Sequence, residues 1–134
     1  MKYEYFIIIG GIYHLICALS HIFFPKVYNW NENLKELSND KKKIIKNNLY
    51  LSNTCTILLW LILSYIPIFY SNEILNSQLG NIFLTLIVLF WVVRIFILQF
   101  IFSNIKTKEF WIRTIFFLFG LFVFFIPWIK IVIK

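Results

Sequence analysis

The fold is decided by residues 80–102, which read GNIFLTLIVLFWVVRIFILQFIF. This stretch carries one charge, Arg94, and a helix of about 20 mostly apolar residues crosses the hydrocarbon of a bilayer. Three similar stretches lie at residues 4–24, 48–70 and 109–128. The whole chain is 60% hydrophobic and 14% charged, whereas soluble domains have about 25% charged residues. The sequence therefore predicts an all-α polytopic membrane protein, a single four-helix up-and-down transmembrane bundle over residues 1–134.

The first span, residues 4–24, contains two histidines, and no small-residue cleavage site follows it. We therefore interpret it as a retained span rather than a signal peptide. Because proline has no N–H to donate, Pro25 is expected to end the helix. A basic loop follows at residues 25–47. Within it, residues 31–37 are expected to form a short interfacial helix and Asp40 to cap the second span.

Lysine and arginine are distributed unevenly between the two ends of the spans. One side has three, at positions 2, 130 and 134, and the other has nine: Lys26, Lys35, Lys41, Lys42, Lys43, Lys46, Lys106, Lys108 and Arg113. The positive-inside rule places the nine in the cytoplasm and both termini outside it. The Lys41–Lys46 cluster is expected to contact anionic lipid headgroups, at about 1 kcal/mol per lysine. Because the net charge of +7 lies in such loops, no nucleic-acid partner is expected.

Polar side chains form a stripe on one face of the first span: His14, Cys17 and His21. One interpretation is structural, with each histidine donating a ring proton to a backbone carbonyl or to a polar side chain of another helix. The alternative is a metal or haem site. His14 and His21 lie about 10.5 Å apart along a helix, so a single ion could be held by His14 with Cys17 or by Cys17 with His21. A haem would need a histidine from a second subunit.

Arg94 is the costliest residue to insert, at roughly 2.5 to 3.5 kcal/mol near the middle of a span. Every acidic residue falls in a loop or at the end of a span, so no carboxylate of this chain reaches its depth. Candidate partners are Asn53, Gln99, the ring of Trp91, backbone carbonyls or an anionic group of a bound molecule. Asn53 shares a helical face with Trp60, Ser64 and Pro67.

Depth counted along the spans predicts two polar layers. One contains His21, Asn53 and Gln99, and the deeper one contains His14 and Arg94. These layers are interpreted either as a hydrogen-bonded network that fixes helix register or as a ligand-binding cavity, whose candidate residues are Arg94, His14, His21, Asn53, Gln99, Trp91 and Trp60. The fourth span is expected to form a wall, with Arg113 at its start and Gly120 at a packing position.

The first three spans also share scattered residues with other proteins: Tyr13-His14-Leu15, Ala18-Leu19-Ser20-His21, Phe24-Pro25, Tyr28-Asn29-Trp30, Leu79-Gly80, Phe90-Trp91, Arg94, Gln99 and Phe102. In these positions the chain resembles a group of small uncharacterised bacterial membrane proteins with four predicted spans. The resemblance implies a bacterial inner membrane and no particular activity. It fades in the fourth span.

Three classes of function follow from these features. The first is a non-enzymatic protein that binds an anionic or carbonyl-bearing small molecule or lipid within its bundle, for transport, sensing or assembly. The second is a haem- or quinone-binding subunit of a membrane redox system, and the third is a structural subunit of a homo-oligomer or larger membrane complex. The spans hold no nucleophile with a base and no pair of carboxylates, which disfavours an enzyme.

Overall fold

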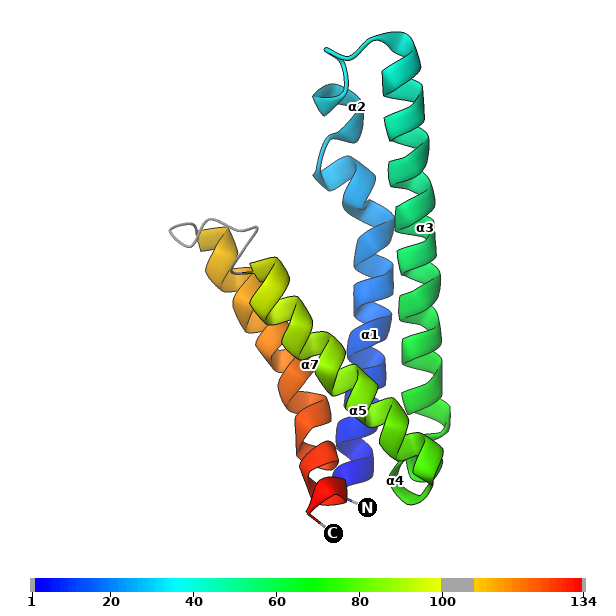
Figure 1. The fold of residues 1–134 in the computed structure, drawn as a ribbon, viewed down its shortest axis with the longest axis vertical. Helices are drawn as coiled ribbons and strands as arrows, with labels where there is room; N and C mark the ends of the chain where they lie inside the picture. Colours follow the sequence, from blue (N-terminus) through cyan, green and yellow to red (C-terminus); the bar gives the residue numbers. More distant parts are fainter. Residues whose placement is uncertain (1, 100–107, 134) are drawn as a thin grey trace.

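The computed structural model describes residues 2–99 and 108–133. Within these ranges all regular structure is helical, and no β-strand occurs. The long helices run alternately up and down (Figure 1): α1 (Lys2–Val27), α3 (Asn39–Phe69), α5 (Gln78–Val93) with its continuation η1 (Arg94–Gln99), and α7 (Lys108–Val132). The prediction of an all-α four-helix bundle is confirmed.

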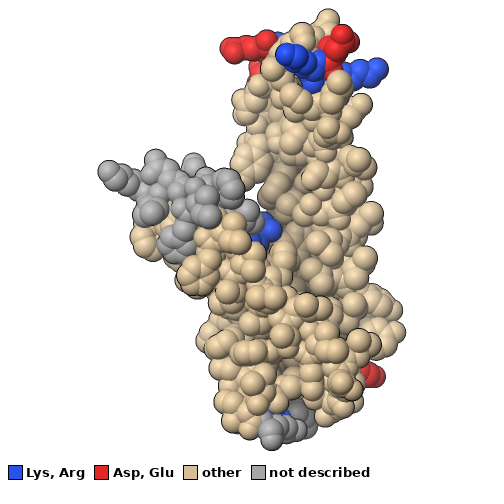
Figure 2. Space-filling view, viewed as in Figure 1, with Lys and Arg blue, Asp and Glu red and all other residues tan. Residues whose placement is uncertain are grey.

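Four helices are long and apolar enough to cross a membrane, with mean hydropathies between 1.6 and 2.4 over their most apolar windows. Figure 2 shows charged side chains gathered mainly at one end of the molecule, with an uncharged surface along most of its length. Such a surface is compatible with hydrocarbon rather than water. Both observations indicate an integral membrane protein.

Helix α1 continues past Pro25 to Val27, so the prediction that Pro25 ends the helix is wrong. A proline leaves the carbonyl four residues earlier, here that of His21, without its helical donor. Asn53 of α3 supplies the missing donor, because its Nδ2 donates to the His21 carbonyl oxygen at 2.9 Å. The neighbouring helix therefore makes the proline tolerable.

Helix α3 begins at Asn39, ahead of the predicted apolar span at residues 48–70, because the lysine-rich segment is itself helical. The residue that precedes its first turn is Ser38, so the expectation that Asp40 caps the helix is also wrong. At 1.5 Å per residue, its 31 residues extend about 46 Å. That length exceeds a hydrocarbon thickness of about 30 Å. The short helix before it, α2 (Trp30–Asn33), covers less than the expected residues 31–37.

The connection between α3 and α5 contains a short helix that was not predicted, α4 (Ser71–Asn76). Ser77 caps α5, because its Oγ accepts the N–H of Gly80 at 2.9 Å. A Cβ at Gly80 would lie 2.6 Å from the carbonyl carbon of Ile74. Only glycine permits α5 to start this close to the backbone of α4.

The long helices form two pairs, α1 with α3 and α5 with α7 (Figure 1). The pairs converge at the end that holds α4 and both termini, and they separate toward the end that holds α2. Trp91 of α5 is fully buried where they meet. Its ring contacts Tyr13 of α1, Trp60 of α3 and Phe117 of α7, with centroid distances of 5.5, 5.6 and 6.0 Å. Trp91 therefore ties its own helix to the three others.

Candidate functional site

A cavity of about 260 Å³ lies between the two helix pairs. All four long helices contribute to its lining: Cys17, Ser20, His21, Phe24, Tyr28, Trp60, Trp91, Arg94, Arg113, Phe116 and Phe117. Two arginines line it and no acidic residue does. Figure 2 shows basic side-chain atoms in the hollow where the pairs separate. The cavity is therefore an aromatic-walled, positively charged space within the bundle.

Arg94 stands at the point where α5 becomes the π-helix η1. π-Helical segments are rare and occur often at functional sites. The guanidinium carbon lies 4.8 Å from the ring centroid of Phe117, 5.7 Å from that of Trp60 and 5.9 Å from that of Phe90. These cation–π contacts offset part of the cost of burying the charge.

One nitrogen of Arg94 nevertheless lacks a hydrogen-bond acceptor. Its Nε is buried and has no hydrogen-bond partner among the described residues. The ion pair between Lys35 and Glu32 lies far from Arg94 in the sequence.

His21 is held by Asn53 through two hydrogen bonds. The Asn53 Nδ2 donates to the His21 carbonyl, and the Asn53 Oδ1 lies 3.1 Å from the ring Nδ1 of His21. The same side chain thus satisfies the carbonyl freed by Pro25 and orients the imidazole. The expected pairing of His21 and Asn53 at one depth is observed.

His14 plays a similar part with Pro67. Pro67 of α3 leaves the carbonyl of Leu63 without a helical donor, and the His14 Nδ1 lies 3.0 Å from that oxygen. Each helix of the α1–α3 pair therefore supplies a side chain that satisfies a carbonyl freed by proline in its partner. His14 does not line the cavity, and its fully buried ring contacts Trp60, Trp91 and Phe124.

The structure divides the residues of the predicted layers differently with respect to the cavity. Arg94 and His21 line it, whereas His14 does not. The common depth of His14 and Arg94 stays a prediction, although both contact the ring of Trp60. Trp60 and Trp91 line the cavity as expected. The side chain of Gln99 lies outside the described part of the structure.

Trp60 and Trp91 form the deepest part of the lining, with exposed fractions of 2% and 0%. The indole Nε1 of each is buried without a hydrogen-bond partner in the described ranges. Together with the Nε of Arg94, three N–H donors of cavity-lining residues lack acceptors. Buried donors without partners are uncommon in folded proteins, and each requires an explanation.

The predicted metal stripe is divided between two environments. Cys17 and His21 line the cavity, whereas His14 bonds to Leu63. In residues 2–99 and 108–133, no three histidine, cysteine or acidic side chains gather closely enough to hold a metal ion. Both cysteines are free thiols.

Several lining residues were not proposed as ligands from the sequence: Ser20, Tyr28, Arg113, Phe116 and Phe117. Arg113 was assigned to a wall, and the structure brings it to the same cavity as Arg94.

Two prolines in the sequence indicate where α1 and α3 are hydrogen-bonded to each other. Pro25 and Pro67 each free a carbonyl four residues earlier, and both carbonyls attract a polar side chain of the facing helix.

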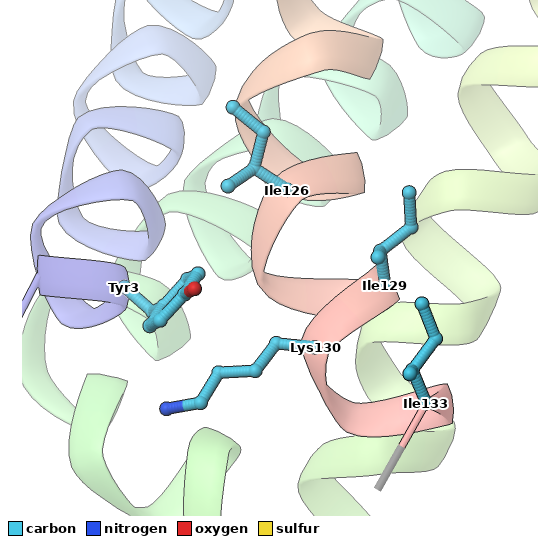
Figure 3. A pocket seen from close by; sticks show the side chains of 5 residues that line it. All are labelled: Tyr3, Ile126, Ile129, Lys130 and Ile133. Atoms are coloured by element: carbon cyan, nitrogen blue, oxygen red, sulfur yellow. The ribbon is translucent and has the colours of Figure 1, made fainter.

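A second pocket, of about 410 Å³, lies near the two termini. Figure 3 shows its lining side chains, including Tyr3 and Lys130. The Lys130 Nζ lies 4.2 Å from the centroid of the Tyr3 ring, so its charge already has a partner. Among the described residues, no buried polar atom without a partner lines this pocket, which makes it a weaker candidate.

Comparisons with known proteins add no relative. No family model, curated protein or solved structure matches the chain. The resemblance to small bacterial membrane proteins therefore stays a prediction from the residues, and the assignment of function rests on the cavity itself.

Proposed function

We propose that the chain is a non-enzymatic membrane protein that binds an anionic or carbonyl-bearing small molecule or lipid in the cavity between its helix pairs, for transport, sensing or assembly. The observation that carries this proposal is the position of Arg94, whose side chain lines the cavity and contacts three aromatic rings but makes no ion pair within the described ranges. A hydrogen bond to a charged group contributes about 1.5–3 kcal/mol. A ligand oxygen that reached the guanidinium would supply such a bond.

Charge supports the same ligand class. The lining contains arginine and no carboxylate, so an anion would meet attraction and no fixed negative charge. The aromatic rings of Trp60, Trp91 and Phe117 would contact the apolar part of such a ligand. Arg94 supplies the charge, and His21, positioned by Asn53, supplies a hydrogen-bonding ring nitrogen. In this proposal His14 acts through its contacts with Trp60 and Trp91.

Replacing Arg94 tests the proposal. Arg94→Leu is expected to insert and fold at least as well as the parent, because an insertion cost of roughly 2.5–3.5 kcal/mol is removed, yet to lose the bound molecule. Arg94→Lys is expected to retain it only in part, since an ammonium lacks the planar multi-donor fork. The measurements are the melting temperature in detergent and mass spectrometry of copurified small molecules and lipids.

Lys130→Leu is the matched control, since it removes a cation that lies outside the cavity. It should leave the copurified molecule unchanged. If Arg94→Leu folds normally and still retains that molecule, the cavity is not its binding site and the proposal fails. If Arg94→Leu cannot fold, Arg94 serves to hold the helices in register instead.

The orientation belongs to the same proposal. We place the lysine-rich end in the cytoplasm of a bacterial cell and both termini outside it, with the Lys41–Lys46 cluster on anionic headgroups. In a Cys55→Ser background, an impermeant thiol reagent applied from outside should label Glu73→Cys and spare Lys42→Cys. Labelling of both variants from the same side would contradict the topology.

The two other functional classes remain predictions. A quinone carbonyl could accept a hydrogen bond from Arg94. A haem would need a histidine with a free ring nitrogen to bind its iron. The Nε2 of His14 is buried without a partner, but the ring is enclosed by Trp60, Trp91 and Phe124. A Soret band that disappears in His14→Ala would favour haem. A partner's carboxylate found at Arg94 would favour the structural subunit.

A further inference from the structure

The hydrogen bonds around His21 determine which ring nitrogen carries its proton. The His21 backbone carbonyl can only accept, so the Asn53 atom 2.9 Å from it must be the amide nitrogen. The Asn53 Oδ1 therefore faces the ring and accepts at 3.1 Å from Nδ1. Since an amide oxygen cannot donate, Nδ1 must carry the hydrogen.

The other ring nitrogen is then an acceptor. A second positive charge beside Arg94 within hydrocarbon would be costly, so the imidazole is neutral and its Nε2 holds a lone pair. His21 lines the cavity. Its Nε2 makes no hydrogen bond to any described residue and is not among the buried atoms without a partner. A molecule in the cavity can therefore reach it.

The cavity thus presents two complementary requirements. Arg94 brings a guanidinium charge to the lining, which attracts an oxygen anion, and His21 presents a nitrogen that needs a donor. Ser20 is not an alternative donor in this conformation, because its Oγ donates to the Cys17 carbonyl at 2.7 Å. A ligand that satisfies both requirements carries a charged oxygen and an O–H on the same group.

Resting on the proposed function, we infer that the cavity recognises a singly charged phosphate monoester, whose P–O⁻ accepts from Arg94 and whose P–OH donates to His21 Nε2. A low-dielectric site favours the less charged of the two forms that such a group adopts near neutral pH. Sulfate and phosphodiesters carry charge but no ionisable O–H at neutral pH, so they meet only the first requirement.

The size of the cavity sets how much of the molecule enters. A volume of about 260 Å³ corresponds to roughly nine water molecules at about 30 Å³ each. This accommodates a phosphoryl group and a few attached atoms. The remainder would extend past Tyr28 and Arg113, two exposed lining residues. Two sources share this chemistry: a lipid with a phosphomonoester headgroup and a free phosphate.

The experiment compares anions that carry an O–H near neutral pH with anions that do not. Inorganic phosphate and sulfate are titrated into the full chain in detergent. In nanodiscs of phosphatidylcholine, phosphatidic acid is compared with phosphatidylmethanol, an anionic diester. Binding is measured by native mass spectrometry and by thermal shift. We expect phosphate to bind roughly tenfold more tightly than sulfate, the effect of one hydrogen bond to a charged group. A preference in the lipid arm alone would identify a lipid headgroup, and one in the ion arm alone a free phosphate.

Variants assign the preference to residues. His21→Phe should bind phosphate and sulfate equally while retaining Arg94-dependent binding, and His21→Gln, which keeps an acceptor oxygen, should restore part of the preference. Arg94→Leu should abolish binding of both anions, and Lys130→Leu should change nothing. If His21→Phe fails to fold, the role of His21 is tested by comparing His21→Gln with the parent. The parent's own preference for phosphate over sulfate still tests the ligand class.

The possible failures are distinguishable. Equal, Arg94-dependent binding of phosphate and sulfate by the parent would overturn the monoester inference and leave an anion site in place. A preference that survives in His21→Phe would overturn the role of His21. An absence of Arg94-dependent binding in both arms would overturn the inference. Whether Arg94→Leu still copurifies with the molecule bound to the parent would then test the proposed function separately.

Discussion

Gly120→Leu is expected to destabilise the bundle by roughly 3 kcal/mol, the upper end of the range for overpacking a filled interior. A Cβ at this position of α7 would lie 2.8 Å from Trp91 Cζ2 and 2.8 Å from Tyr13 Cε1. Neither ring can retreat, because Trp91 is fully buried and the Tyr13 hydroxyl donates to the Phe116 carbonyl at 2.7 Å. A leucine would push α7 away from both α1 and α5.

The measurement is the melting temperature of purified protein in detergent, with Phe122→Leu as the control. Phe122 lies on the same helix and is 57% exposed, so its substitution should shift the melting temperature little. From the sequence, Gly120 was expected only to occupy a packing position of the fourth span. The structure places it against Trp91, so Gly120→Leu should also weaken ligand binding. An unchanged melting temperature would show that α7 packs differently.

Trp91→Ala should cost about 3–5 kcal/mol, the usual range for truncating a buried large aromatic residue. Trp91 is the side chain through which α5 contacts α1, α3 and α7, and its loss would leave a void where the two pairs meet. Because the indole also lines the cavity, ligand binding should fall with stability. Reversible unfolding in a detergent and denaturant titration measures the first effect.

Trp111→Ala provides the matched control, since Trp111 is a tryptophan of α7 with 57% of its surface exposed. Its removal should change the free energy of unfolding by far less. Comparable losses in the two variants would mean that tryptophan content, rather than the junction of the pairs, determines stability.

Much of the fold could be predicted because hydrophobic length is a local property. The absence of charges over residues 80–102, apart from Arg94, indicates a span without any knowledge of its neighbours. The extension of α1 beyond Pro25 could not be predicted in this way. It depends on Asn53, a residue of another helix, whose amide replaces the missing donor.

Part of the site could also be predicted, because some of its features depend on the sequence of one helix alone. Spacing alone placed His14, Cys17 and His21 on one face, and counting along the helices matched His21 with Asn53. Counting did not show that Arg94 and His21 would line one cavity, because that depends on how the α5–α7 pair is inclined to the α1–α3 pair (Figure 1). Inclination is set by tertiary contacts such as those of Trp91 and Gly120, which no single helix encodes.

The divergence of the helix pairs makes the molecule's cross-section in the plane of the bilayer unequal at its two ends (Figure 1). A wedge of this kind occupies more area in one leaflet than in the other. Lateral pressure in the wider leaflet acts to drive the pairs together, and bilayer tension acts to spread them. The cavity lies between the pairs, so a change in the angle between them would alter both its volume and the area that the molecule occupies in the membrane.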